Sequence, residues 1–328
     1  MRKSTIWAAT ALLLGATQAA AAPSGSFSVL EENDLFFNTD HHYTNGTALA
    51  YTTPPLDADD WAVAAADFLP MFQSGGKDFE VRTTYELGQD MFTPDNTALA
   101  VPDPKDRPYA GYLFAGVGVL SKTEDRMDQL QLQLGMVGPA SLAEDAQKFV
   151  HGILNDAKPQ GWSHQLRDEP GLVLTYDRTY RSPKVHLPLG LAMDFAPHMG
   201  TTIGNVYDYV DLGAMVRGGF GLPDDFGPMR LNPSLPGSNY FEPRHAISAY
   251  LFAGVDGRAV ARNLFLDGNT FQTSPHVAKN ILVGDFLIGA AVETHWFRVA
   301  FTHVFRTKEF KTQTSTDQFG AVSLSVAL

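Results

Sequence analysis

Residues Asp128–Val137 read DQLQLQLGMV, and polar and apolar side chains alternate along this segment. In an extended strand its leucines and Met136 point to one side, and Gln129, Gln131 and Gln133 point to the other. The segment therefore predicts a β-strand with one apolar and one polar face. Its ten residues match the roughly 9–11 residues that a tilted strand needs to cross a bilayer.

The same alternation recurs along the chain, so we predict an all-β protein. About twelve segments show it, and many are 8 to 12 residues long. The predicted strands are Phe27–Asn33, Gly46–Thr53, Glu80–Gly88, Gly111–Leu120, Asp128–Val137, Leu172–Tyr180, Val185–Phe195, Val206–Arg217, Ala246–Val260, Ile281–Val292, His295–Phe305 and Phe319–Leu328.

Two architectures produce this pattern: a water-soluble sandwich or propeller, and a closed antiparallel transmembrane β-barrel. In a membrane barrel the apolar faces meet lipid and the polar faces line the interior. The even number of segments, their Gly and aromatic residues and the amphipathic C-terminal segment Phe319–Leu328 favour the barrel.

Composition excludes several other classes of protein. The 328 residues contain no Cys, which excludes a disulfide scaffold, a cysteine zinc site and a cysteine nucleophile. The formal net charge of −12 argues against a nucleic-acid partner, which would need clustered Lys and Arg. Neither a Gly-x-Ser-x-Gly elbow nor a His-Glu-x-x-His helix nor a phosphate-binding loop occurs in the sequence.

The N-terminus has the features of an export signal. Arg2 and Lys3 precede the apolar run Ala8–Ala16, and small residues follow it. We predict a signal peptide over residues 1–21 and a single outer-membrane barrel domain over residues 22–328. The alternative, an N-terminal membrane anchor, fits less well because the run is shorter than the roughly 18 residues of a helical span.

The predicted connections differ in length between the two ends of the barrel. If the N-terminus starts in the periplasm, the connections after odd-numbered strands face the exterior, and these are mostly long, including Pro197–Asn205. Several of the others are short. Two inner connections, 54–79 and 218–245, are long, and the first contains a helix-like segment, Asp60–Phe68.

The third exterior connection, residues 138–171, predicts a short helix. Ser141-Leu142-Ala143-Glu144 has the spacing of a capping box. Gln147 and His151 then share one helical face, and the apolar residues form a separate stripe. The stripe consists of Leu142, Ala146, Phe149, Val150, Ile153 and Leu154. Such a helix can lie against the barrel wall.

Two groups of polar residues are candidates for chemistry. Closure of the first hairpin brings Asn33, Asp34 and Thr44 together, and their oxygen atoms suit Ca²⁺, although the same residue types are common in ordinary turns. His151 has an imidazole suited to abstracting a proton from water, and Gln147, one turn earlier, is placed to orient it. The alternative for His151 is a merely packed or solvated side chain.

A third candidate is Arg107, in the segment Asp106–Gly111 that closes the second exterior loop. Its guanidinium can bind a phosphate or carboxylate in a bidentate manner. The alternative is an Asp106–Arg107 pair that fixes the loop. The adjacent histidines His41 and His42 lack the spacing of helical metal ligands.

Together, these blocks resemble the LpxR-type outer-membrane lipid A 3′-O-deacylases. The resemblance covers nearly the whole mature chain and implies a barrel of twelve strands. The matching stretches are Glu32-Asn33-Asp34, Tyr43-Thr44-Asn45-Gly46, Asp106-Arg107-Pro108-Tyr109-Ala110-Gly111, and the block from Gly138-Pro139 through Gln147 and His151 to Gly161-Trp162 and Gln165.

The resemblance also implies roles for individual residues. Members of the family remove the 3′-linked acyloxyacyl chain of lipid A in a Ca²⁺-dependent reaction. Asn33, Asp34 and Thr44 match residues of the metal-bearing site, and His151 matches the general base. The family also uses a lysine in the second exterior loop, for which Lys105 is the candidate, and an acid after the histidine, for which Asp156 is the candidate. Lys105, Arg107 and Tyr109 are the expected substrate-binding residues.

We therefore expect a Ca²⁺-dependent carboxylic ester hydrolase in the bacterial outer membrane, with its active site facing the cell exterior. Its expected partners are lipid A or lipopolysaccharide in the outer leaflet and membrane lipid, with no nucleic acid, and a monomer is expected. Two alternatives stay open: a barrel phospholipase acting on glycerophospholipids, and a non-enzymatic pore or surface barrel.

Overall fold

The computed structural model describes residues 25–328 except 38–41, 73–78, 155–156, 230–239 and 244–245. The predicted signal peptide, residues 1–21, and Asp156 lie outside the described residues. The strands are β1 Ser26–Asn33, β2 His42–Thr52, β3 Glu80–Thr93, β4 Ala110–Lys122, β5 Arg126–Val137, β6 Glu169–Tyr180, β7 Val185–His186, β8 Leu191–Gly204, β9 Tyr207–Phe220, β10 Ile247–Asn263, β11 Leu282–Thr294, β12 Phe297–Arg306 and β13 Asp317–Ala327. The helices are η1 Asp34–Phe37, α1 Trp61–Phe68, η2 Pro139–Ser141, α2 Ala143–Leu154, η3 Trp162–His164, η4 Pro188–Gly190 and α3 Leu264–Asp267.

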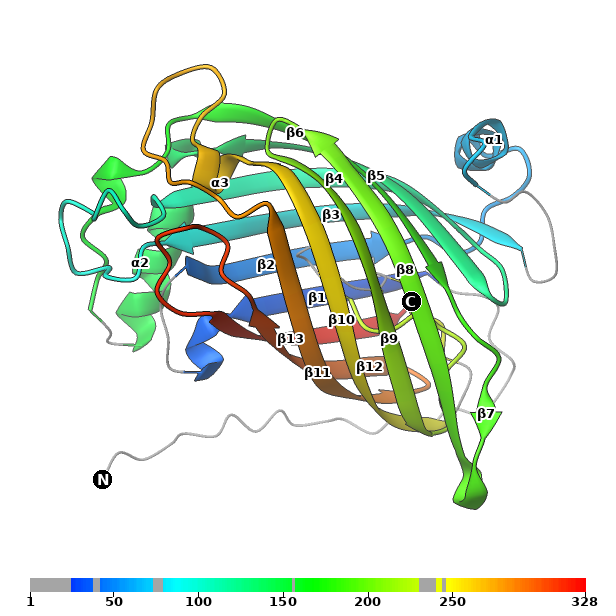
Figure 1. The fold of residues 1–328 in the computed structure, drawn as a ribbon. Coiled ribbons are helices and arrows are strands. Elements are labelled where there is room, and N and C mark those ends of the chain that lie inside the picture. The colour runs from blue at the N-terminus through cyan, green and yellow to red at the C-terminus, as the bar shows by residue number, and fades with distance from the viewer. Residues whose placement is uncertain (1–24, 38–41, 73–78, 155–156, 230–239, 244–245) are drawn as a thin grey trace.

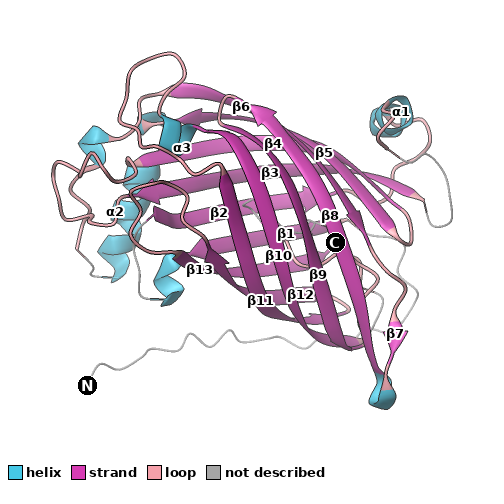
Figure 2. Cartoon of the chain, viewed as in Figure 1, coloured by secondary structure: helices cyan, strands magenta, loops and turns pink. Residues whose placement is uncertain are grey.

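The strands form one closed antiparallel barrel (Figures 1 and 2). Each long strand pairs with its neighbours along the chain, and β1 closes the sheet by pairing with β13. The pairing of β6 with β8 leaves the two-residue β7 outside the cylinder. The barrel thus has twelve strands, as predicted, plus one short extra strand. Among the described residues, no helix has both the length and the apolar character to span a bilayer.

The two faces of the wall follow the predicted alternation. In β5, Gln131 points into the lumen, where its Nε2 donates a hydrogen bond to Glu86. Leu130 points outward and packs against the apolar cluster that includes residues of α1. Leu134 is exposed on the outward face. This is the arrangement expected when lipid surrounds the cylinder and polar groups fill it. We call the surface that points away from the lumen the outward face.

Connections of different length gather at the two ends of the barrel. One end, called the loop end, carries η1, η2, α2, η3 and α3 (Figure 1). The opposite end, called the turn end, carries the two- and three-residue turns at 295–296 and 123–125. It also carries α1, whose N-cap Asp60 accepts a hydrogen bond from Ala62 N at 2.9 Å, so the predicted helix at 60–68 is confirmed.

One predicted strand and the loop after it were placed wrongly. Val185–Phe195 was predicted as a strand and Pro197–Asn205 as an exterior loop. Instead, a turn at Leu189 and Gly190, both with positive φ, breaks the alternating segment, and β8 continues to Gly204. The mistake arises because the lumen-facing residues of β8 are polar, so that this half of the strand resembles a loop in sequence. The connection from β8 to β9 has only two residues, 205–206.

The described part of the connection from β9 to β10, residues 221–229 and 240–243, enters the lumen from the turn end. Its Met229 packs among Leu30, Ala48 and Ala321 on the lumen side of strands across the barrel. Asp225 lies between two completely buried guanidinium groups, those of Arg217 and Arg298, and pairs with both. This segment therefore fills part of the lumen and joins β9 to β12.

Opposing effects set the charge state of Asp225. Burial alone would raise the pKa of its carboxyl, but Arg217 and Arg298 hold the pKa below its usual value. The ionised form is therefore favoured in the folded protein. Its contribution to stability is present above the pKa of the unfolded chain and is lost as the pH falls through the lowered pKa of the folded chain.

We predict that Asp225→Asn lowers the free energy of unfolding by about 3–5 kcal/mol, because it removes the carboxylate that pairs with the buried guanidinium of Arg298 and one of the two that pair with Arg217, the other being Asp194. Urea-induced unfolding in lipid vesicles, followed by Trp fluorescence, measures this loss at neutral pH. Asp224→Asn is the neighbouring control: its side chain is 40% exposed, so solvent weakens its pairs with Arg181 and Lys184, and a clearly smaller loss of about 1 kcal/mol is expected. Equal losses in the two variants would contradict this account.

Candidate active site

Asn33 and Asp34 lie where β1 ends at the loop end of the barrel. Asn33 is paired with Asn45 of β2 and with Gly320 of β13. Its neighbour Glu32 faces the lumen, where it accepts a hydrogen bond from Tyr43 OH at 2.9 Å, so Asn33 faces outward. Asp34 begins η1 and is only 2% exposed. The pairing of Asn33 with Asn45 thus brings the end of β1 beside the start of β2.

Thr44 is the extra residue of a β-bulge. The pairing of β2 with β3 passes from Tyr43↔Phe92 directly to Asn45↔Met91, which leaves Thr44 without an opposite residue. Its Oγ1 lies 2.7 Å from Oγ1 of Thr93, and its side chain is buried. A bulge redirects the side chains of a strand. Here it places Thr44 next to the residue that pairs with Asn33.

A carboxylate that the sequence analysis did not single out lies just below these residues on the outward face. Glu31 Oε2 accepts a hydrogen bond from Thr47 Oγ1 at 2.6 Å, and Asn45 Nδ2 donates to the other oxygen of the same carboxylate. A charged group on a lipid-facing wall is costly unless it is hydrogen-bonded. The signal was present in the sequence, because Glu31 continues the outward-facing series of Phe27 and Val29.

Helix α2 is seated on the outward face of β3 and β4. Met91 of β3 packs with Ala143 and Trp162, and Gln89 Nε2 donates to the carbonyl oxygen of Ser141 at 2.6 Å. Gly111 of β4 lies directly beneath, where a Cβ would clash with Ser141 and Ala143. The absence of a side chain at Gly111 therefore lets the helix contact the barrel wall.

The helix begins where predicted, but its cap is not a capping box. Ser141 belongs to the separate turn η2, and its Oγ donates to the carbonyl oxygen of Gly138 at 2.6 Å. Leu142, in the left-handed conformation with φ 60°, joins η2 to α2. The capping-box prediction was wrong because Gly138-Pro139 starts a turn that takes up the serine hydroxyl.

His151 and Gln147 lie on the buried side of α2. His151 is 5% exposed, and its Nδ1 lies 2.7 Å from the carbonyl oxygen of Ala157. Because a carbonyl oxygen can only accept, Nδ1 carries the hydrogen of this bond, and the neutral ring then has its lone pair on Nε2. Gln147 Oε1 accepts a hydrogen bond from Trp162 Nε1 at 2.7 Å. Both side chains are thus held in defined orientations.

The apolar side of α2 points away from the protein. Phe149 is 70% exposed and Ile153 is 64% exposed, and Leu142 and Val150 are exposed as well. We call these four residues the α2 ridge. A helix in water would bury such residues and expose its His and Gln. The reversed arrangement indicates that the ridge faces an apolar medium.

The three predicted substrate-binding residues have different environments. Lys105 is exposed, and its backbone nitrogen donates to Asp103 at 2.9 Å. Tyr109 is completely buried, donates to the carbonyl oxygen of Thr97 at 3.2 Å and packs on Trp162. Arg107 is also completely buried: it pairs with Glu309 at 3.2 Å and stacks on Phe92. In the structure Arg107 and Tyr109 therefore hold loops in place.

His42 was not a candidate in the sequence analysis, because its spacing from His41 is not that of helical metal ligands. In the structure it links β2 with Asp106 of the second exterior loop and with Asp317 at the start of β13. Its Nδ1 lies 2.6 Å from Asp317, and its Nε2 lies 3.5 Å from Asp106. Burial would raise the pKa of the Asp106 carboxyl, but hydrogen bonds from His42 and from the backbone of Asp95 and Arg107 lower it below its usual value. Asp106 therefore pairs with His42 through its side chain. The alternative of an Asp106–Arg107 side-chain pair is not what fixes this loop.

The oxygen-donor group and α2 occupy neighbouring parts of the same outward face. β2, β3 and β4 are consecutive in the sheet, so Thr44 and Gly111 lie two strand spacings apart, about 10 Å. Figure 1 shows α2 and η1 at the same end of the barrel. The arrangement combines an imidazole with its lone pair on Nε2 and a set of carboxylate, amide and hydroxyl oxygens, which is suited to hydrolysis assisted by a cation.

Comparison with known proteins gives a family and a fold. The family model described as outer membrane protein LpxR matches residues 6–328. The structure of LpxR from Salmonella typhimurium matches with a TM-score of 0.74 and 20% sequence identity, over 92% of this chain and 100% of that chain. The β domain of the Bordetella autotransporter BrkA matches with a TM-score of 0.46 and 8% identity, over 94% of this chain and 100% of that chain.

No curated protein matches this chain by sequence. The Salmonella typhimurium structure establishes the fold: a closed antiparallel barrel of LpxR architecture. The family model spans nearly every residue, including all the candidate site residues described above. This chain therefore belongs to the LpxR family of outer-membrane proteins.

Proposed function

We propose that this protein is an ester hydrolase that removes the 3′-linked acyloxyacyl chain of lipid A. One observation carries the proposal: helix α2, which bears His151, packs on the outward face of the barrel wall, and Asn33 at the end of β1 faces outward beside it and not into the lumen. A molecule that reaches this face arrives sideways from the lipid layer. The substrate is therefore a membrane lipid, in agreement with membership of the LpxR family.

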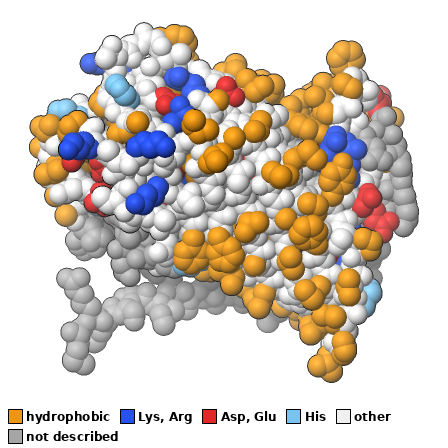
Figure 3. Space-filling view, viewed as in Figure 1, with side chains coloured by type: hydrophobic (Ala, Val, Ile, Leu, Met, Phe, Trp, Pro, Cys, Tyr) orange, Lys and Arg blue, Asp and Glu red, His pale blue; other side chains and the backbone are white. Residues whose placement is uncertain are grey.

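The charge and apolarity of the loop end fit an anionic glycolipid of the outer leaflet. Figure 3 shows Lys and Arg side chains at the end of the barrel that carries the loops, beside hydrophobic side chains over the strands. The exposed basic residues of the loop-end connections are Lys105, Lys148, Lys158, Arg167, Lys308 and Lys311. The α2 ridge lies beside them and would contact acyl chains. We accordingly place the loop end at the cell exterior, since long loops are usual on that side.

The residues at the end of the first hairpin fit Ca²⁺. Asn33, Asp34 and Thr44 offer an amide oxygen, a carboxylate and a hydroxyl, and hard oxygen donors are the ligands that Ca²⁺ prefers. When bound there, Ca²⁺ would supply positive charge where the ester oxygen becomes negative. Glu31, hydrogen-bonded to Asn45 on the same face, adds a further negative charge nearby.

His151 has the orientation that a general base requires. Its Nδ1–H is held by Ala157, so Nε2 takes a proton from water as the water oxygen attacks the ester carbonyl carbon. The bond between that carbon and the 3′ oxygen then breaks, and the oxygen receives the proton from Nε2. The products are the released acyloxyacyl acid and a 3′ hydroxyl. Trp162 fixes Gln147 beside this histidine, and Lys105 is the exposed cation for the headgroup.

We predict that His151→Ala lowers the rate of deacylation by at least about 100-fold, because no other group in the proposal takes the proton from water. Mass spectrometry of lipid A from cells that express each variant measures the loss of the 3′ chain. The control is His164→Ala, an exposed histidine of the same connection whose Nδ1 lies 3.1 Å from Oγ of its neighbour Ser163. Wild-type deacylation by the His151 variant would exclude its role as the base.

We predict that chelation stops deacylation by the purified protein and that added Ca²⁺ restores it. Asp34→Asn removes the carboxylate and should raise the Ca²⁺ concentration needed for half-maximal activity by at least about tenfold. Asp103→Asn, an exposed acid of the second loop, should leave this concentration unchanged. Full activity in excess chelator would remove the metal from the reaction.

We predict that vesicles of lipid A are deacylated while vesicles of glycerophospholipid are not. Fatty-acid release from the latter at a similar rate would favour the phospholipase alternative. A pore is disfavoured because residues 221–229 and buried ion pairs fill part of the lumen. Steady conductance in planar bilayers without any esterase activity would support that alternative instead.

A further inference from the structure

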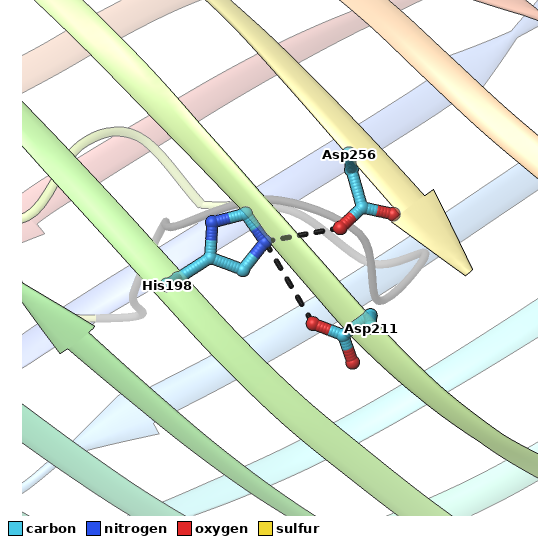
Figure 4. Close-up of side chains that lie close together, drawn as sticks. All are labelled: His198, Asp211 and Asp256. Carbon is cyan, nitrogen blue, oxygen red and sulfur yellow. Dashed lines mark hydrogen bonds and ion pairs between the residues drawn. The ribbon is translucent and has the colours of Figure 1, made fainter. Parts of the chain in front are cut away.

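We propose that the lumen contains a divalent-cation site formed by His198, Asp211 and Asp256. The three side chains come from the neighbouring strands β8, β9 and β10 and point toward one another (Figure 4). All three are buried, and their ligand atoms lie within 4.8 Å of one another. This site is separate from the outward-facing group of Asn33, Asp34 and Thr44.

The strand register creates the site. Gly213 of β9 pairs with His198 on one side and with Asp256 on the other. A Cβ at Gly213 would clash with the imidazole of His198. Because Gly213 has no side chain, His198 and Asp256 meet above it, with Nε2 and Oδ2 3.0 Å apart.

A second glycine, Gly200, likewise lies between two acidic residues on the neighbouring strands. Gly200 of β8 pairs with Asp177 of β6 on one side and with Asp211 of β9 on the other. A Cβ at Gly200 would lie 2.5 Å from an oxygen of each carboxylate, so these two oxygens are at most 5.0 Å apart, twice that distance. Asp177 is thus placed to serve as a further ligand or to bind water on the cation.

The distances suit a small divalent ion. His198 Nε2 lies 3.0 Å from Asp256 Oδ2 and 3.7 Å from Asp211 Oδ2. Ligand atoms about 2.1 Å from a tetrahedral metal are about 3.4 Å apart, so small rotamer changes bring these atoms into position. A mixed set of imidazole nitrogen and carboxylate oxygen favours Zn²⁺ or a similar transition metal over Ca²⁺.

Within the part of the chain that the structure describes, the carboxylate oxygens of the site have too few hydrogen-bond and ion-pair partners. The side chain of Asp211 is 3% exposed, and its one ion-pair partner there is His198 at 3.7 Å, beyond hydrogen-bond distance. Asp256 Oδ1 is buried and has no hydrogen bond among the described residues. Buried carboxylates in this state are costly, and a bound cation would satisfy both.

The charge around the site also favours a cation. Two carboxylates, those of Asp211 and Asp256, face one imidazole, and Asp177 lies beside Asp211 across Gly200. The nearby guanidinium of Arg258 is turned toward another acid: its Nη2 lies 3.1 Å from Asp285, whereas its Nε is 3.7 Å from Asp256. A small cavity lined in part by Tyr209, Arg258 and Asn280 lies next to this guanidinium.

Titration of the purified, metal-stripped full chain with Zn²⁺ tests the proposal. Isothermal titration calorimetry should find a site that is weakened at least about tenfold in Asp211→Asn and in Asp256→Asn. Asp34→Asn, at the outward-facing group, should keep this site unchanged. Retention of wild-type Zn²⁺ affinity in both lumen variants, or no Zn²⁺ binding by the folded wild type, overturns the proposal.

A second measurement covers the case in which the lumen variants fail to fold, which heat-modifiable migration in gels would reveal. Anomalous diffraction from Zn²⁺-soaked crystals of the wild type locates the ion directly. A peak between His198, Asp211 and Asp256 supports the proposal. A peak confined to the outward face of the barrel contradicts it.

Discussion

Closure of the sheet is the constraint on which the rest of this structure depends. In a bilayer every backbone N–H and C=O group must be hydrogen-bonded within the protein, and the pairing of β1 with β13 removes the last free edges of the sheet. Closure also gives each strand two environments, lipid outside and a polar lumen inside. A polar side chain on the outward face is therefore an exception that needs a reason. Glu31, Asn33, Thr44 and Asn45 are such exceptions, and they gather in one place.

The same constraint explains the orientation of α2. On a soluble protein an amphipathic helix buries its apolar stripe, but α2 buries Gln147 and His151 and exposes Phe149 and Ile153. The buried side meets the polar rim of the wall, and the exposed side meets lipid. The helix therefore lies on β3 and β4, beside the polar exceptions of β1 and β2, and presents an apolar surface to lipid.

The sequence predicted much of this because alternation survives in any barrel strand, and hairpin closure alone brings Asn33 beside the start of β2. The predictions from sequence failed for features that depend on residues far away in the chain. The polar half of β8 resembles a loop unless the lumen is known to be polar. The bulge at Thr44 depends on the partner strand β3. His42 gains its partners, Asp106 and Asp317, from loops far apart in the chain.

The lumen shows most clearly that the pairing register of the strands decides which polar side chains meet, which composition alone does not. His198 and Asp256 are 58 residues apart in the sequence and meet only because Gly213 lies between them in the sheet. Shifting either strand by one residue would turn the side chain to the lipid face. No pattern within a single strand identifies such a pair. In a closed barrel, a glycine that lies between two polar residues on its neighbouring strands therefore indicates that the two side chains meet above it.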